Sequence, residues 1–149
     1  MTRLIISLII SSLTLTSCSN NPKSEVNNSH QSVVLPDSFS DFLDEFHSDE
    51  AFQKAHIQWP LQGLPTLMND GDSISVDGSF RWTEEEWVMH HEFDENNEEF
   101  EQTYTMVGDD IIIEQILHIN GTMGMERRFS RQDDSWMLIY YAGMNLIRQ

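Results

Sequence analysis

The chain has 149 residues, of which 25 are Asp or Glu and 8 are Lys or Arg, so its formal net charge is −17. This balance argues against nucleic-acid binding, because nucleic-acid phosphates repel an acidic surface, and against direct binding of the domain to anionic lipid. Cys18 is the single cysteine, so the fold must rest on packing rather than on an internal disulfide.

Residues 1–18 have the pattern of a bacterial lipoprotein signal. Arg3 supplies the positive start, an apolar stretch from Leu4 to Leu15 follows, and small residues then lead to Cys18. The apolar stretch is shorter than the roughly 20 residues that span a bilayer, as in an export signal. We expect cleavage of residues 1–17, diacylglycerol on the Cys18 sulfur and a fatty acyl group such as palmitate on its amino terminus. An ordinary secretory signal is the alternative.

The residue after the lipidated cysteine predicts where the anchor lies. It is Ser19 rather than Asp, which favours sorting to the outer membrane in many Gram-negative bacteria. Acidic residues directly after Cys18, which favour surface display in some groups, do not follow. Two or three acyl chains hold a protein firmly. We therefore expect an outer-membrane lipoprotein that faces the periplasm and contacts the membrane through the lipid on Cys18.

The mature chain divides into a tether and one domain. Residues 18–36 are polar, have no hydrophobic period and end at Pro36, which is typical of a flexible tether. Residues 37–149 are long enough for a single domain with a core of its own.

Two helices are expected at the start of this domain. Four apolar residues spaced along one helical face predict the first: Phe39, Phe42, Leu43 and Phe46. Ser48 begins a shorter second helix that runs to about Ile57, before Pro60.

Short strands are expected in the rest of the chain. Asp77-Gly78 predicts a hairpin turn between strands at residues 73–76 and 79–82. Thr83 and Glu86 form a capping box, which predicts a helical turn as far as His90. Later turns are expected at residues 108–110, 120–121 and 133–135. The sequence thus predicts an α+β domain, with N-terminal helices packed on a curved antiparallel sheet.

Several stretches resemble a known family. They are FLDEFHSDEAFQKAHIQWPL at residues 42–61, Arg128-Phe129 before a polar turn, and Trp-Met-Leu at residues 136–138. They resemble a bacteroidete lipoprotein family of unknown function with the nuclear-transport-factor-2-like (cystatin-like α+β) fold. The resemblance implies a cone of three helices inside a strongly bent sheet, whose concave face forms a pocket. Because this fold occurs in isomerases, dehydratases and non-catalytic binding modules, it does not choose a function.

No motif predicts a metal ion or a cofactor. The residues His-His-Glu-Phe-Asp at 90–94 lack the HExxH spacing of a zinc protease, and the calcium-like starts at residues 70–73 and 94–98 lack the required Glu at position twelve. Met123-Gly124-Met125 offers thioethers but is more typical of packing. Thirteen acids and no Lys or Arg lie between Arg81 and Arg127, which indicates a solvated face or a surface for a cationic partner or divalent ion.

The leading functional hypothesis is a non-catalytic binding or accessory domain whose ligand is unknown. The alternative is a small enzyme of the isomerase or dehydratase kind, with a pocket formed by four candidate side chains: Tyr104, Glu114, His118 and Tyr140. The tripeptide Asp72-Ser73-Ile74 also fits a bacteroidete O-glycosylation pattern. The sequence does not indicate an oligomeric state.

Overall fold

The computed structural model describes residues 33–66 and 79–147. Cys18, Ser73, the predicted strand at residues 73–76 and its turn at Asp77-Gly78 lie outside the described residues. The elements are α1 (Asp37–Ser48), α2 (Glu50–Ala55), β1 (Ile57–Leu64), β2 (Arg81–Trp82), β3 (Phe100–Val107), β4 (Ile111–His118), β5 (Met123–Gln132) and β6 (Ser135–Leu146).

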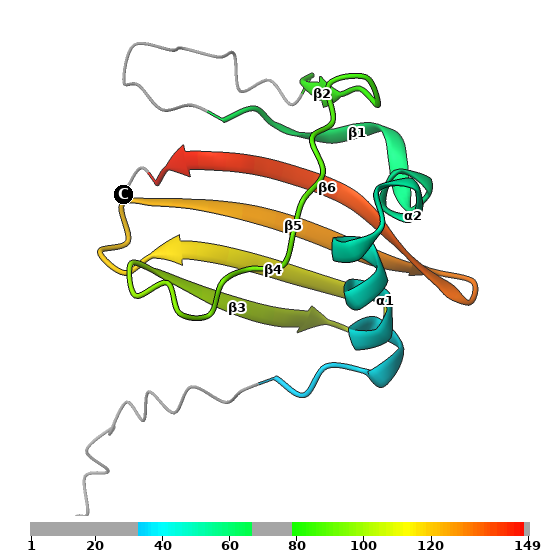
Figure 1. Cartoon of the computed structure of the whole chain (residues 1–149), viewed down its shortest axis with the longest axis horizontal. Coiled ribbons are helices and arrows are strands. Elements are labelled where there is room, and N and C mark those ends of the chain that lie inside the picture. The colour runs from blue at the N-terminus through cyan, green and yellow to red at the C-terminus, as the bar shows by residue number, and fades with distance from the viewer. Residues whose placement is uncertain (1–32, 67–78, 148–149) are drawn as a thin grey trace, which may run out of the picture. The chain divides into compact units, whose positions relative to one another are not determined.

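The six strands form one sheet in the order β2-β1-β6-β5-β4-β3. All neighbouring strands are antiparallel except β1 and β6, which are parallel. Both helices lie against one face of this sheet, and the segment from β2 to β3 crosses the same face (Figure 1). The predicted α+β class is confirmed, with one correction: the segment after the helices is a parallel strand of the sheet. Where the resemblance implies three helices, the described residues form two.

The core lies between α1 and the sheet. All four apolar residues of the predicted α1 stripe are buried. Phe129 of β5 contacts the rings of Phe39, Phe42 and Phe46 at centroid distances of 5.3, 5.8 and 5.6 Å. Full burial of one such side chain stabilises the fold by about 1.5–3 kcal/mol, so the stripe fixes α1 on the strands.

No helix among the described residues is long and apolar enough to cross a membrane.

The second helix is shorter than expected. Its cap is Asp49 rather than Ser48, because the Asp49 carboxylate accepts a hydrogen bond of 2.9 Å from the Phe52 amide. The helix ends at Ala55, and Ile57 already belongs to β1. The interpretation of Ile57 as helical was wrong, because Ile57 pairs with Leu138 of β6 and its buried side chain belongs to the core.

The segment between β2 and β3 is mostly extended. The expected helix from Thr83 to His90 is reduced to one turn at residues 84–86. The Thr83 hydroxyl donates to the Glu86 carboxylate at 2.9 Å, whereas in a complete capping box it accepts a hydrogen bond from the Glu86 backbone amide. The turns at residues 108–110, 120–121 and 133–134 are confirmed.

Candidate functional site

Four polar or aromatic side chains form a row across the sheet face that the helices cover. Tyr104 of β3 pairs with Glu114 of β4, Glu114 pairs with Arg127 of β5, and Arg127 pairs with Tyr141 of β6. We call these four residues the polar row. Directly opposite residues on neighbouring strands share a face, so the row brings together side chains that are distant in sequence.

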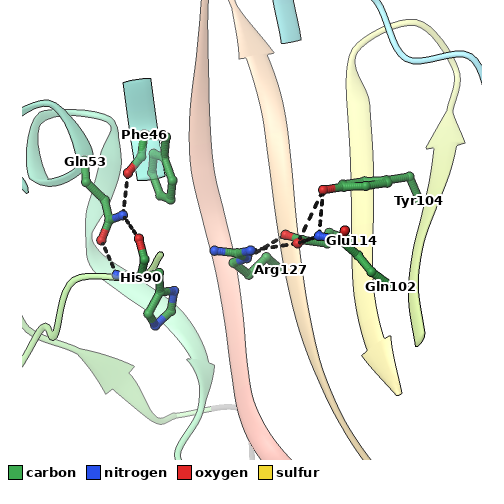
Figure 2. A network of polar contacts seen from close by, with 7 residues as sticks. All are labelled: Phe46, Gln53, His90, Gln102, Tyr104, Glu114 and Arg127. Carbon is green, nitrogen blue, oxygen red and sulfur yellow. Dashed lines mark hydrogen bonds and ion pairs between the residues drawn. The ribbon is translucent and has the colours of Figure 1, made fainter. Parts of the chain in front are cut away.

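The centre of the polar row is a buried ion pair. Glu114 has no exposed surface and Arg127 is 2% exposed. Arg127 Nε donates to Glu114 Oε2 at 2.6 Å, and its Nη2 donates to Oε1 at 2.7 Å. Gln102 Nε2 donates to the same Oε1 at 2.7 Å, as Figure 2 shows. Both carboxylate oxygens are therefore occupied, and the two charges neutralise each other.

Tyr104 lies at one end of this ion pair. Its hydroxyl is 3.5 Å from Glu114 Oε1 and accepts a hydrogen bond of 2.9 Å from Gln102 Nε2. Burial and the neighbouring Glu114 charge raise the pKa of the Tyr104 phenol. The phenol consequently stays protonated and acts as a neutral hydrogen-bonding group.

A bulge in β6 brings Tyr141 to the other end of the row. Phe129 pairs with Leu138 but the adjacent Arg128 pairs with Tyr140, so one extra residue is inserted in β6. A bulge of this kind reverses which side chains face inward. Tyr140 therefore faces away from the helices, with the Arg128 guanidinium 4.4 Å from its ring centroid.

Gln53 of α2 fastens the segment between β2 and β3 to the helices. Its Nε2 donates to the Phe46 carbonyl at 2.6 Å and to the His90 carbonyl at 2.8 Å. Its Oε1 accepts from the His90 amide and from the Trp87 indole, each at 2.8 Å. Gln53 is fully buried, and Figure 2 shows its amide between Phe46 and His90. This side chain determines where Trp87 and His90 lie.

Two histidines, His47 of α1 and His90 of the segment between β2 and β3, lie within electrostatic range of the ion pair. Burial, together with the Arg127 charge, lowers the pKa of His90 to about 3 and that of His47 to about 4. Both are therefore neutral at pH 7. One ring nitrogen of each, His90 Nδ1 and His47 Nε2, is buried without a hydrogen-bond partner among the described residues.

Beside Tyr141 the surface is hollowed into a cleft of about 190 Å³, which we call the aromatic cleft. Its lining residues are Thr66, Trp82, Glu86, Trp87, Val88, His90 and Tyr141.

Tyr141 lies at the centre of the rings that line the cleft. Its ring centroid is 4.6, 5.3 and 5.5 Å from those of His90, Trp82 and Trp87. The Trp82 indole donates to the Tyr141 carbonyl at 3.0 Å, and the Trp87 indole is bound by Gln53. Because both indole N–H groups have protein partners, the tryptophans offer the cleft their carbon surfaces.

A glycine permits this arrangement of rings. A Cβ atom at Gly63 of β1 would lie 1.8 Å from the Tyr141 carbonyl oxygen and 3.0 Å from the Trp82 indole nitrogen. The bare backbone at this position therefore allows Trp82 and Tyr141 to approach β1 closely.

The structure brings together two of the four candidate pocket residues. Tyr104 and Glu114 are neighbours in the polar row. His118 lies at the end of β4, where its ring contacts Phe100 at 5.0 Å and its Nδ1 accepts from the Asn120 amide at 3.2 Å. Tyr140 faces outward because of the bulge.

Sequence reasoning did not identify Arg127, Tyr141 or Gln53 as site residues. One signal was available for Arg127: counting equal numbers of residues back from the Asn120-Gly121 turn pairs it with Glu114. The inward position of Tyr141 depends on a bulge, and the role of Gln53 depends on a contact with a residue 37 positions away. Neither feature has a local signature in the sequence.

The metal-like motifs within the described residues do not form a cluster, and the calcium-like start at residues 70–73 lies outside those residues. Within residues 33–66 and 79–147, no group of three or more His, Cys, Asp or Glu side chains is placed to hold a metal ion. His90 lines the cleft whereas His91 is exposed. Asp94 accepts a hydrogen bond of 3.0 Å from the Asn96 amide, as in an ordinary turn.

No protein-family model matches the chain. No curated protein matches it.

Solved structures with a similar backbone come from Bacteroides. A protein from Bacteroides uniformis, solved by NMR, has 18% sequence identity and a TM-score of 0.52, over 73% of this chain and 78% of that one. A crystal structure titled as an NTF2-like protein from Bacteroides fragilis has 18% identity and a TM-score of 0.46, over 74% and 48% of the two chains. An NMR structure from Bacteroides ovatus has 23% identity and a TM-score of 0.44, over 68% and 70%. At 18% identity, the similarity to the Bacteroides uniformis protein concerns the fold alone.

Proposed function

We propose that this chain is a lipid-anchored lipoprotein of the outer membrane whose nuclear-transport-factor-2-like domain binds a ligand in the periplasm without catalysing a reaction. The observation that carries the binding role is the aromatic cleft, where Trp82, Tyr141 and His90 meet around about 190 Å³ of open space. Binding sites are typically concave and lined by aromatic side chains with a few polar groups.

The protonation states around the cleft favour binding over acid–base catalysis. An efficient general base has a pKa near the working pH, whereas the pKa of His90 is lowered to about 3. Both oxygens of Glu114 are bound by Arg127, and the raised pKa of Tyr104 makes its phenol a poor proton donor. The polar row, of which only Tyr141 lines the cleft, is better suited to holding this face of the sheet rigid.

The binding role is tested by protein-observed NMR on the Cys18→Ala chain, which retains every described residue. Small ring-containing fragments should shift the indole resonances of Trp82 and Trp87 and the amide of His90. Trp82→Ala should remove these shifts, whereas Phe100→Ala, which removes a ring outside the cleft lining that contacts His118, should leave them. Fragment shifts that map away from the cleft, or no shifts at all, would refute the binding role.

The anchor rests on the sequence of residues 1–18. Cys18→Ala should move the protein from the membrane fraction to the soluble periplasmic fraction and remove incorporation of labelled palmitate. Ser19→Ala, which changes the adjacent residue, should leave both unchanged. Cys18→Ala protein that still sediments with membranes would overturn the anchor, and wild-type protein found only in inner-membrane fractions would overturn the outer-membrane assignment.

One observation favours the enzymatic alternative: a buried carboxylate, Glu114, lies beside a half-buried phenol, Tyr104. An isomerase or dehydratase that used them would lose turnover in Tyr104→Phe while its unfolding midpoint stayed close to that of the wild type. Retained turnover in this variant would exclude Tyr104 from the chemistry.

A further inference from the structure

The aromatic cleft combines ring faces with a single carboxylate. Two tryptophans and a tyrosine line it, and both indole N–H groups donate to protein acceptors. His90 is neutral at pH 7 because its pKa is lowered to about 3. Tyr141 stays a neutral phenol because burial raises its pKa, so the carboxylate of the exposed residue Glu86 is the one formal charge among the described residues of the lining. The lining therefore presents electron-rich ring faces and one negative charge.

Three basic residues could cancel this charge, but none does. Lys54, whose pKa is raised by Glu50 and also by Glu84, is paired with Glu50 at 2.9 Å. Arg127 lies opposite the cleft residue Tyr141 on the neighbouring strand, but it is neutralised by Glu114 in a bidentate pair. Arg81 precedes Trp82 in β2, so strand alternation directs the two side chains to opposite faces. No Lys or Arg occurs between Arg81 and Arg127, a stretch with 13 acids. The electrostatic field around the cleft is that of an anionic surface.

The size of the cleft limits what it can hold. Pockets for drug-sized ligands have volumes of about 300–1,000 Å³, whereas this cleft has about 190 Å³. It therefore suits one compact group of a few heavy atoms rather than a whole sugar chain or nucleotide. A compact group matched to ring faces and a carboxylate is a positively charged nitrogen, since cations are attracted to the faces of Trp and Tyr.

We propose that the aromatic cleft binds an organic cation, as an ammonium or quaternary ammonium group, against the rings of Trp82, Trp87 and Tyr141, with Glu86 as the counter-charge. This inference rests on the proposed binding function and specifies its ligand chemistry. The cation can belong to a free small molecule or to a lysine side chain, and these two sources share the same recognition.

A pair of isosteric probes tests the charge directly. Choline and 3,3-dimethylbutan-1-ol have the same shape, but only choline is charged. Each is titrated into the Cys18→Ala chain at constant ionic strength, while the indole resonances of Trp82 and Trp87 are followed by NMR. Choline should bind between about fivefold and thirtyfold more tightly than the alcohol. A third titration with Nα-acetyl-lysine methylamide separates the sources: tighter binding than choline assigns the site to lysine side chains, and weaker binding to quaternary amines.

Substitution of one carboxylate tests the counter-charge. Glu86→Gln should weaken choline binding about two- to fivefold and leave binding of the alcohol unchanged. Glu85→Gln is the matched control, because it removes the same charge from a neighbouring exposed residue that does not line the cleft. Choline affinity should be the same in this control as in the wild type. Equal losses in the two variants would mean that only the general field acts, and would overturn the role of Glu86.

The outcomes separate this inference from the proposed binding function. Equal affinity for choline and the alcohol would overturn the cation inference and leave the binding function standing. The same conclusion would follow if neutral fragments shift the cleft resonances while choline and the lysine derivative do not. If no probe or fragment shifts these resonances, both the inference and the proposed function fail.

Discussion

Breaking the buried Glu114–Arg127 pair should destabilise the domain far more than replacing it altogether. Arg127→Met would leave the fully buried Glu114 carboxylate with Gln102 at 2.7 Å and Tyr104 at 3.5 Å as its remaining donors. Glu114→Met would leave a 2% exposed guanidinium without its anion. Removal of one partner of a buried pair costs about 3–5 kcal/mol of unfolding free energy.

The double substitution should cost less than either single one. Replacement of a whole buried pair by apolar residues of similar volume is often neutral or stabilising, because no charge is then left in the interior. Urea unfolding at pH 7 gives the free energy of unfolding for the wild type, the two single variants and the double variant. We expect a coupling energy of about 3 kcal/mol or more between the two sites.

An exposed pair on the same strand provides the control. Arg128 and Glu126 are joined at 2.6 Å, like the buried pair, but their side chains are 44% and 21% exposed. Glu126→Met should therefore change the unfolding free energy by about 1 kcal/mol or less. The buried pair is not coupled as described if Glu114→Met and Arg127→Met lower the unfolding free energy no more than this control does. The same holds if the loss in the double variant equals the sum of the losses in the two single variants.

Three further changes follow from the same contacts. The folded pKa values of His47 and His90, about 4 and 3, lie below the unfolded value of 6.5, so the unfolded chain binds more protons as the pH falls below 6.5. The unfolding free energy should then drop by about 1 kcal/mol per histidine from about pH 7 to about pH 5.5. Urea titrations should show half of this drop in His90→Gln. An unfolding free energy that does not change over this pH range would contradict the burial of the two histidines. Gly63→Ala should lower the unfolding free energy by about 3 kcal/mol or more, because its methyl group would meet the β6 carbonyl oxygen at 1.8 Å. Gly108→Ala, with open space but a φ of +64°, should cost only about 1–2 kcal/mol. Equal melting temperatures of the two variants would refute the steric account. Gln53→Leu should accelerate hydrogen exchange at the His90 amide, because that amide would lose its acceptor; unchanged exchange would mean that the segment is held in another way.

The helices and turns could be predicted from the sequence because their signals are local. The α1 stripe repeats with the helical period, and all its members are buried. Asn120-Gly121 marked a hairpin in which Gly121 adopts a φ of 70°. The end of α2 and the strand β1 were harder, since β1 pairs with β6 in parallel and the partner residues are about 80 positions away in sequence.

The candidate site was predictable only in part. Glu114 was a candidate because strand alternation places it on one face with His118, and Tyr104 because its hydroxyl can donate a proton. Tyr141 was missed because the bulge in β6 reverses the alternation that begins at Trp136 and Leu138. Trp87 was assigned to a helical turn, whereas its position depends on Gln53. Both failures come from contacts between distant segments, which local propensity does not encode.

The way in which Gln53 binds His90 has a consequence for how this protein can evolve. Both hydrogen bonds go to the main chain of His90, so the identity of its side chain does not contribute to them. The side chain that lines the cleft at position 90 can therefore be replaced while Gln53 still binds the segment between β2 and β3. Selection, or a library of variants at position 90, can change what the cleft recognises without first rebuilding the scaffold beneath it.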